Sequence, residues 1–324
     1  MSEQSRDVAT GALCGRLPDM AGPDEGLPCV LERFELAGHQ DPLAAWDAFT
    51  RTWNWAALLG TALSVGAGPV ARAVQGGFSL SGTWLRPTGE QSGWFAVPAA
   101  AERLQGHVGA GGDPDLFVIP ERTLPRAPSG QDGERGHTSA FELKDVFVAA
   151  GLATHATGTA LRVEDALFLR TAVTAMALGA ARRVTDALAG LAPGAGAGAG
   201  EVSAAVSPAA SAVELAAVLH DERTALAAVL RGLPRSGRAT ASVSAEPAAA
   251  HLERVGPIVR HIVVAAYERA LPSTGHPEGQ SLVRTVEDAA PILQCMRFAV
   301  ETLPPLSKTP TRKAQHGDER RIPG

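Results

Sequence analysis

The sequence predicts an α+β fold in which a central small β-sandwich or barrel is followed by a C-terminal four-helix bundle and preceded by a short helical segment. Short apolar runs bounded by Gly, Pro or Asp fill residues 66–168, which is typical of strands. Beyond residue 168, apolar residues recur at steps of three and four, which is typical of helices. With 324 residues and 45% hydrophobic residues, the chain is long enough to bury a sizeable core.

The N-terminal part is predicted to contain a flexible arm and one helical region. Residues 1–28 are rich in Gly, Pro and acidic residues, which favours a mobile arm. Residues 29–65 are predicted to be helical, because Leu31, Phe34 and Trp46 fall on one apolar face. Gly66, Gly68 and Pro69 follow at once and are expected to end this helix.

The middle domain, residues 66–168, is predicted from compact apolar runs that turn residues separate. The predicted strands cover residues 74–80, 94–97, 116–119, 141–147 and 161–168. The segment 121–138 is polar and is predicted to be an exposed loop.

The C-terminal domain, residues 169–303, is predicted to consist of four helices at about 169–191, 208–231, 248–271 and 280–303. Pro257 and Pro291 are expected to kink or interrupt the last two helices. The alternating Gly and Ala run at 194–200 is predicted to be a flexible loop, and the polar tail at 304–324 is predicted to be disordered.

Charge and composition exclude several classes of function. The formal net charge is −5, so the chain has no basic field that would attract nucleic acid or an anionic membrane. The N-terminus is polar and the apolar runs are far too short to span a bilayer. Cys14, Cys29 and Cys295 form no disulfide framework, and together these features favour a cytoplasmic protein.

The common site motifs are absent from the sequence. It contains no P-loop, HExxH or GxSxG, and no GxGxxG follows a predicted strand. The nine histidines are scattered and none is paired at metal-ligand spacing, so no metal site is expected. Cys295 is interpreted as a buried structural thiol, the alternative being a reactive thiol whose pKa Arg297 would lower.

Four segments of the chain resemble successive motifs of one known protein family. Residues 76–89, GGFSLSGTWLRPTG, resemble a glycine-rich strand of that family, and residues 157–168, which begin TGT, are similar to a later strand. Residues 171–182 resemble the helix that opens its C-terminal bundle, and residues 282–288, LVRTVED, resemble a motif near its end. In their order and on the expected elements, these segments resemble the acyl-CoA dehydrogenase superfamily, most closely its branch of flavin-dependent hydroxylases and nitrososynthases.

The resemblance implies a flavin held between the β domain and the bundle, either bound FAD or reduced FMN or FAD supplied by a reductase. It implies eight cofactor-binding residues: Trp84, Thr88, Gly89, Thr157, Gly158, Thr159, Arg284 and Asp288. Hydroxyls and backbone N–H groups suit the flavin N1 and N5 positions. The alternatives are a plain turn at residues 87–89 and a plain i,i+4 ion pair between Arg284 and Asp288.

The sequence also departs from the family pattern. Residues 29–65 correspond to only a small part of the family's N-terminal helical domain. In the family, that domain supplies one wall of the acyl pocket. The carboxylate base of the dehydrogenases has no counterpart in residues 295–303, so no catalytic residue is assigned. Because a reduced-flavin monooxygenase needs no such base, this departure weakens the classical dehydrogenase reading.

The sequence therefore predicts a flavin-dependent oxidoreductase acting on a small acyl, aromatic or amine substrate, as a reduced-flavin monooxygenase or an atypical acyl-CoA dehydrogenase. One alternative is a non-catalytic paralogue that serves as a structural subunit of a hetero-oligomer, and another is a non-redox enzyme that reuses the pocket. The resemblance implies a homo- or heterotetramer, with a flavin reductase or a full-length homologous subunit as partner.

Overall fold

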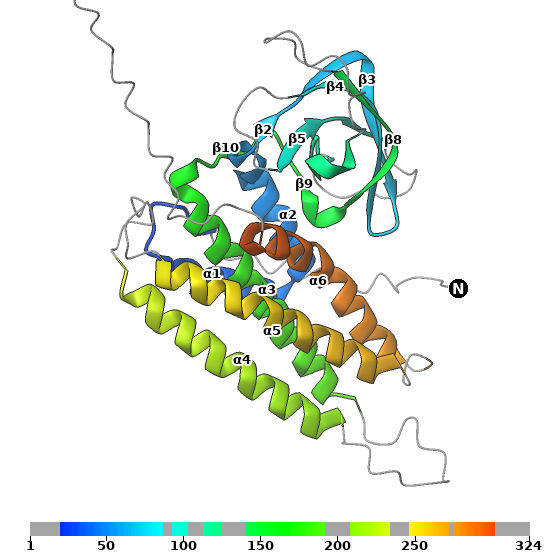
Figure 1. The fold of residues 1–324 in the computed structure, drawn as a ribbon. Coiled ribbons are helices and arrows are strands. Elements are labelled where there is room, and N and C mark those ends of the chain that lie inside the picture. The colour runs from blue at the N-terminus through cyan, green and yellow to red at the C-terminus, as the bar shows by residue number, and fades with distance from the viewer. Residues whose placement is uncertain are drawn as a thin grey trace, which may run out of the picture.

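The computed structural model describes residues 20–86, 93–102, 113–124, 140–191, 208–233, 246–271, 275 and 277–301. The tail at 304–324 and the Gly/Ala run at 194–200 lie outside these residues, as do the first 19 residues of the predicted arm and most of the predicted loop at 121–138. The fold is α+β, as the sequence predicts: the helices form one body and the strands form another beside it (Figure 1).

In the ranges that the structure describes, six α-helices make up the helical body. They are α1 (Leu27–Gln40), α2 (Pro42–Thr52), α3 (Ala166–Ala189), α4 (Pro208–Arg231), α5 (Glu246–Ala270) and α6 (Pro277–Glu301). The last four match the predicted C-terminal helices to within a few residues. Helices α5 and α6 run through Pro257 and Pro291, so neither proline ends its helix.

Helix α3 lies at the centre of the helical body and is buried along most of its length, with α1, α4, α5 and α6 packed around it. Two glycines allow α1 to approach it closely. A Cβ at Gly38 would lie 2.2 Å from the carbonyl oxygen of Met176, and a Cβ at Gly179 would lie 2.0 Å from that of Glu35. The two backbones are therefore in direct contact, which no larger residue at these positions permits.

The buried carboxylate of Glu35 also ties α1 to its neighbours. It accepts from Arg182 of α3 at 2.8 Å and from Arg223 of α4 at 2.9 Å. Both arginines reach solvent, so their charges are not fully desolvated. The predicted N-terminal helical region is thus part of the same core as the C-terminal helices.

The described residues contain ten strands, eight of which form the two sheets of the second body. They are β1 (Trp53–Asn54), β2 (Gly60–Thr61), β3 (Leu63–Val74), β4 (Gly77–Leu85), β5 (Trp94–Pro98), β6 (Ala100–Glu102), β7 (Leu116–Pro120), β8 (Ala140–Ala149), β9 (Ala153–Thr154) and β10 (Thr159–Ala160). Two four-stranded sheets, ordered β2-β5-β7-β9 and β6-β3-β4-β8, share one apolar core, and β1 pairs with β10. Short 3-10 helices connect these elements, among them η1 (Trp55–Leu58), η2 (Glu121–Thr123), η3 (Ala150–Leu152) and η4 (Val163–Asp165).

Two sequence predictions of secondary structure are wrong. Residues 53–65 do not continue the α-helix, because Trp53 and Asn54 pair in parallel with Thr159 and Ala160 and thereby end α2 at Thr52. Within this stretch only the short 3-10 helix η1 is helical. Tertiary pairing here overrides the helical spacing of the apolar residues. Gly66 and Pro69 lie within β3, where they accompany a shift in its register with β4.

Residues 161–168 do not form a strand. The Arg162 N–H donates to Oδ2 of Asp165 at 2.9 Å, and this contact fixes the turn η4, after which α3 begins at Ala166. Glu164 and Asp165 therefore belong to a helical turn rather than to the predicted strand.

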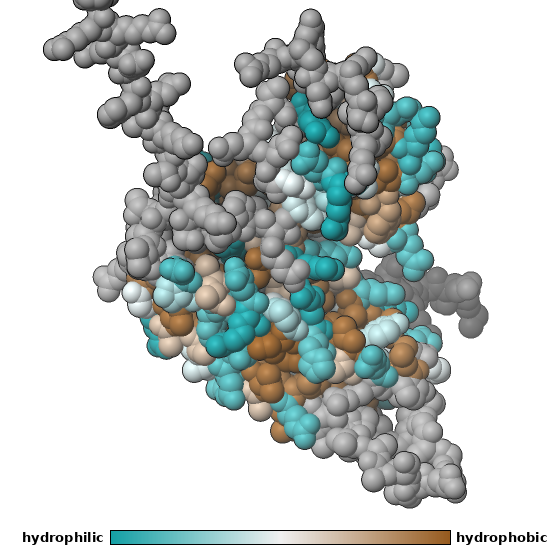
Figure 2. All heavy atoms as spheres, in the orientation of Figure 1, coloured by the Kyte–Doolittle hydropathy of each residue, from teal (hydrophilic) through white to brown (hydrophobic). Residues whose placement is uncertain are grey.

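The β domain meets the helices along α6. The Gly151 N–H of η3 donates to Oε1 of Gln294 at 2.9 Å, and a Cβ at Gly151 would lie 2.0 Å from the carbonyl oxygen of Pro291. Polar and apolar side chains are interspersed on the face of the helices that Figure 2 shows. Within the part of the chain that the structure describes, no helix is both long and apolar enough to cross a membrane.

Candidate functional site

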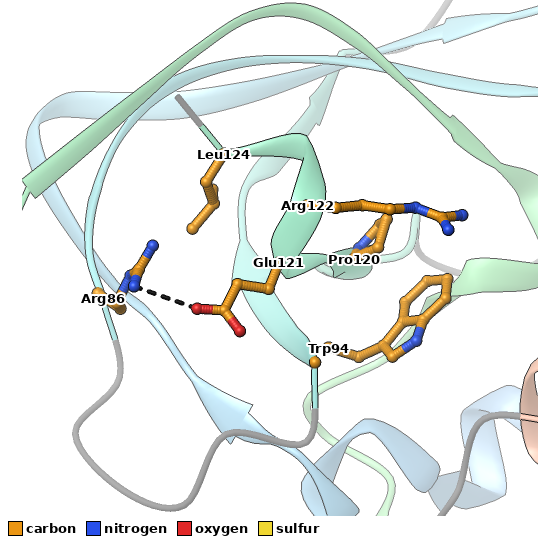
Figure 3. Close-up of a pocket in the computed structure, with 7 residues that line it drawn as sticks. Arg86, Trp94, Pro120, Glu121, Arg122 and Leu124 are labelled. Atoms are coloured by element: carbon orange, nitrogen blue, oxygen red, sulfur yellow. Dashed lines mark ion pairs between the residues drawn. The ribbon is translucent and has the colours of Figure 1, made fainter. Parts of the chain in front are cut away.

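A pocket of about 550 Å³ opens in the β domain, at one end of strands β4, β5 and β7. The side chains that line it include Arg86, Trp94, Pro120, Glu121, Arg122 and Leu124 (Figure 3). Because the pocket combines apolar walls with charged side chains, it is the candidate functional site among the described residues.

Three chain segments place these side chains. Arg86 directly follows β4, Trp94 begins β5, and Glu121 begins the turn η2 after β7. Trp94 pairs with Pro120 across the sheet, and the Glu121 N–H donates to the carbonyl oxygen of Gly93 at 2.8 Å. These backbone bonds fix the spacing between Trp94 and Glu121 and make the pocket a product of the sheet.

The electrostatics of the pocket depend on an ion pair between Arg86 and Glu121, whose atoms Nη1 and Oε1 lie 3.1 Å apart. The two side chains are 34% and 29% exposed, so the pair is reachable from solvent but partly screened from it. Glu121 turns toward Arg86, whereas Arg122 extends to the opposite side, where the Trp94 indole lies (Figure 3).

Trp94 connects the pocket to the helical body. Its ring packs edge-to-face on Phe298 of α6 at a centroid distance of 5.2 Å, and Phe298 also contacts Trp55 of η1 at 5.4 Å. The buried Arg170 of α3 donates from Nε to the carbonyl oxygen of Ala299 at 3.1 Å, which anchors the last turn of α6 beside these rings. One wall of the pocket is therefore held at the junction of the two bodies.

Trp84, a predicted cofactor contact, is fully buried between the two sheets. Its indole N–H donates to the carbonyl oxygen of Pro98 at 2.8 Å, and its ring stacks on Phe141 at 5.8 Å. These contacts give Trp84 a packing role, and its contact with a flavin stays a prediction. Thr88 and Gly89 lie outside the described residues, between Arg86 and Gly93 in the sequence.

Thr157, Gly158 and Thr159 lie against the end of α2 rather than at the pocket. Thr159 pairs with Trp53, and a Cβ at Gly158 would lie 2.8 Å from the backbone nitrogen of Asn54. The side chains of Thr157 and Thr159 are exposed. Their role at a flavin or substrate rim stays a prediction, since the structure places them next to the N-terminal helices.

Arg284 and Asp288 lie on α6, and neither lines the pocket. Arg284 is exposed, and Asp288 is half-buried. Burial raises the pKa of the Asp288 carboxyl, and the nearby Asp41 carboxylate adds to this effect, whereas Arg183 opposes it. The flavin role of these two residues likewise stays a prediction.

Replacing Asp288 with Asn is expected to stabilise the protein at pH 7. The raised pKa means that the folded state holds the Asp288 proton more tightly than the unfolded state, so its contribution to stability falls as the pH rises above the ordinary value of 3.8. The gain of Asp288→Asn should vanish near pH 3, where both forms are neutral. Urea unfolding at both pH values checks this, with Glu214→Gln, at an exposed residue of α4, as control. A variant less stable than wild type at pH 7 would contradict the expectation.

Sequence reasoning missed Trp94, Glu121 and Arg122. Arg86 fell within a motif segment, but nothing in the sequence marked it as a binding residue. The partners that make these residues into a site come from separate strands, so only adjacency to the motif strand β4 offered a signal. Cys295, by contrast, is fully buried, and burial raises its pKa, which agrees with the structural interpretation and not with the reactive one.

No three His, Cys, Asp or Glu side chains gather as a metal site within the described ranges. No protein-family model matches the chain, and no curated protein matches it. Solved structures do resemble it. They include the HsaA monooxygenase from M. tuberculosis, with 16% identity, a TM-score of 0.34, and coverage of 87% of this chain and 80% of that one.

Two further solved structures resemble the chain. XiaF from Streptomyces sp., in complex with FADH2 and glycerol, is 14% identical with a TM-score of 0.36, covering 88% of this chain and 85% of that one. Butyryl-CoA dehydrogenase from Megasphaera elsdenii is 14% identical with a TM-score of 0.32, covering 84% and 79%. The neighbours are thus a monooxygenase, an FADH2-binding protein and an acyl-CoA dehydrogenase. At these TM-scores the function has to be argued from residues of this chain.

Proposed function

We propose that the pocket binds a flavin and that the protein is a flavin-dependent oxidoreductase acting on a small acyl, aromatic or amine substrate. One observation carries this proposal. The pocket opens where β4 ends, and β4 is the strand whose sequence resembles the flavin-contacting strand of the acyl-CoA dehydrogenase superfamily. Trp94 joins the same pocket to α6, so it lies beside the junction where the resemblance implies a flavin.

The residues of the pocket fit a flavin. The Trp94 indole offers an aromatic face for a planar ring, and Arg86 and Arg122 offer cationic donors for a negatively charged group. The volume lies within the range of roughly 300–1,000 Å³ that small-molecule sites occupy. When bound, the flavin would supply the redox chemistry, while the chain would bind and orient it and exclude water from its ring.

The missing carboxylate base favours the monooxygenase form of this proposal over the dehydrogenase form. The base that the dehydrogenases use has no counterpart in residues 295–303. Glu121, the carboxylate among the described lining residues, is paired with Arg86 in the structure. The protein would then use reduced FAD or FMN delivered by a reductase and would assemble as a homo- or heterotetramer.

A flavin titration tests the proposal. FAD, FMN and their reduced forms are added to the wild type and to Trp94→Leu, and binding is followed by fluorescence. Loss of the stacking face should weaken binding by about tenfold, because such stacking contributes roughly 1–3 kcal/mol. Phe147→Leu, at an exposed aromatic residue of β8, is the matched control and should bind like wild type.

Two results of the titration would count against the proposal. If no flavin bound the wild type, the proposal of a flavin-dependent oxidoreductase would be rejected, and the alternative of a non-catalytic paralogue would be supported. If flavin bound equally well to wild type and Trp94→Leu, the chain would bind it at a place other than this pocket.

A further inference from the structure

We propose that the pocket recognises a planar aromatic molecule that carries an anionic phosphate or carboxylate group, and that Glu121 competes with this group for Arg86. The inference deepens the proposed function by naming the chemistry that the site selects. It rests on that proposal only where the aromatic molecule is taken to be a flavin.

Arg86 has hydrogen-bond donors that a ligand anion can reach. A guanidinium carries five N–H donors arranged for planar, bidentate contact with carboxylate or phosphate. The contact between Nη1 of Arg86 and Oε1 of Glu121 engages one edge of that group, and a third of the Arg86 side chain is open to solvent. An incoming anion can therefore reach the guanidinium without unfolding the strand that carries it.

The pocket combines a net positive charge of its described side chains with an apolar wall. The described side chains of the pocket include two guanidiniums and one carboxylate, which leaves a net positive charge in a site walled by Trp94, Pro120 and Leu124. An apolar wall with an aromatic face favours a planar ring, and the excess positive charge favours an anionic substituent on it. Neither a neutral aromatic molecule nor a small inorganic anion satisfies both features.

Glu121 can release Arg86 without disturbing the backbone around it. In the structure its carboxylate occupies the position that a ligand anion would take beside Arg86 (Figure 3). The backbone of Glu121 is held independently, because its N–H donates to Gly93 and its carbonyl accepts from the Leu124 N–H. Its side chain is therefore free to yield Arg86 to a stronger anion, and replacing it leaves the turn η2 intact.

Two probe pairs test the inference, each differing only in the anionic group. FMN is compared with riboflavin, and 4-(1-naphthyl)butyl phosphate with 4-(1-naphthyl)butan-1-ol, by titration of the whole chain. A chain between ring and anion is needed because the Trp94 indole and Arg86 lie on opposite sides of Glu121 (Figure 3). In the wild type the phosphate-bearing member of a pair should bind about tenfold more tightly, which corresponds to about 1.4 kcal/mol, because its anion makes a charge-assisted contact with Arg86. Glu121→Gln should tighten only the phosphate-bearing member, and Arg86→Gln should abolish the difference within the pair.

Glu142→Gln is the matched control, because it removes a carboxylate that pairs with Lys144 on an exposed strand of the same domain. It should change no affinity by more than about twofold. Raising the salt concentration should weaken the phosphate-bearing probes more than the neutral ones.

The two probe pairs separate failure of the inference from failure of the proposed function. If only the naphthyl pair shows the pattern, the inference holds for an aromatic anion and the flavin function falls. If the flavins bind but FMN and riboflavin bind equally, the flavin function stands and the inference is overturned. If the phosphate-bearing probes bind no better than the neutral ones in either pair, or if Glu121→Gln weakens them, the inference is also overturned.

Discussion

Replacing Gly179 with Ala should lower the free energy of unfolding by about 3 kcal/mol, although alanine is the better helix former. The new Cβ would lie 2.0 Å from the carbonyl oxygen of Glu35, a backbone atom that cannot move without displacing α1 from α3. The clash therefore outweighs the gain in helix propensity. Urea unfolding followed by circular dichroism measures the change.

A second glycine in a helix provides the control. A Cβ at Gly256 in α5 would lie 3.9 Å from the nearest Met296 atom, so Gly256→Ala is expected to stabilise the protein by about 0.5–1 kcal/mol. Gly38→Ala should behave like Gly179→Ala, because its Cβ would meet the carbonyl oxygen of Met176. Equal effects of Gly179→Ala and Gly256→Ala would contradict the direct contact between the α1 and α3 backbones.

Replacing Trp84 with Ala should cost about 3–5 kcal/mol, the usual cost of deleting a fully buried tryptophan. The change removes the ring that stacks on Phe141 and leaves the carbonyl oxygen of Pro98 without its indole donor. Thermal and urea unfolding measure the loss, which is large enough to unfold a marginally stable domain.

Trp84→Phe separates the packing role from a flavin contact. It keeps an aromatic ring in the core but loses the indole N–H, so we expect a smaller loss of stability, about 1–3 kcal/mol. With a pure packing role, the folded variant should bind flavin like wild type. A tenfold loss of flavin affinity in the folded Trp84→Phe protein would instead place this ring at the cofactor, as the sequence resemblance implies.

The C-terminal helices were predictable because their signal is local. Apolar residues recur at helical spacing from Leu169 to Leu188 and from Leu215 to Leu230, and this pattern is sustained over many turns. The core confirms it: Leu188, Leu219, Leu226 and Leu230 are all buried. The length of these segments was decisive, because a helical spacing sustained over several turns distinguishes a helix from a strand.

The short segments around the domain junction were not predictable in this way. Residues 53–54 form a strand only because Thr159 and Ala160 lie beside them, more than 100 positions away in the chain. The strand predicted at 161–168 became a turn and a helix, since the Asp165 side chain bonds the Arg162 N–H. In both places, contacts that composition does not record decided the outcome.

The candidate site was predictable only as a region. The motif at residues 76–89 led to β4, and the pocket does lie at the end of that strand. Trp94 and Glu121 carry no motif of their own, because their role comes from the pairing of Trp94 with Pro120 and from the reach of Glu121 to Arg86. Because the residues that line the pocket come from separate strands, they have no fixed spacing in the sequence that would identify them.

A crystal structure of the chain with bound FMN would show whether the pocket is the flavin site. We expect the isoalloxazine ring to pack on the Trp94 indole, with the FMN phosphate on Arg86 and the Glu121 carboxylate displaced from it. An isoalloxazine bound elsewhere in the molecule, with the Arg86–Glu121 pair unchanged, would overturn both the proposed flavin site and the proposed role of Arg86.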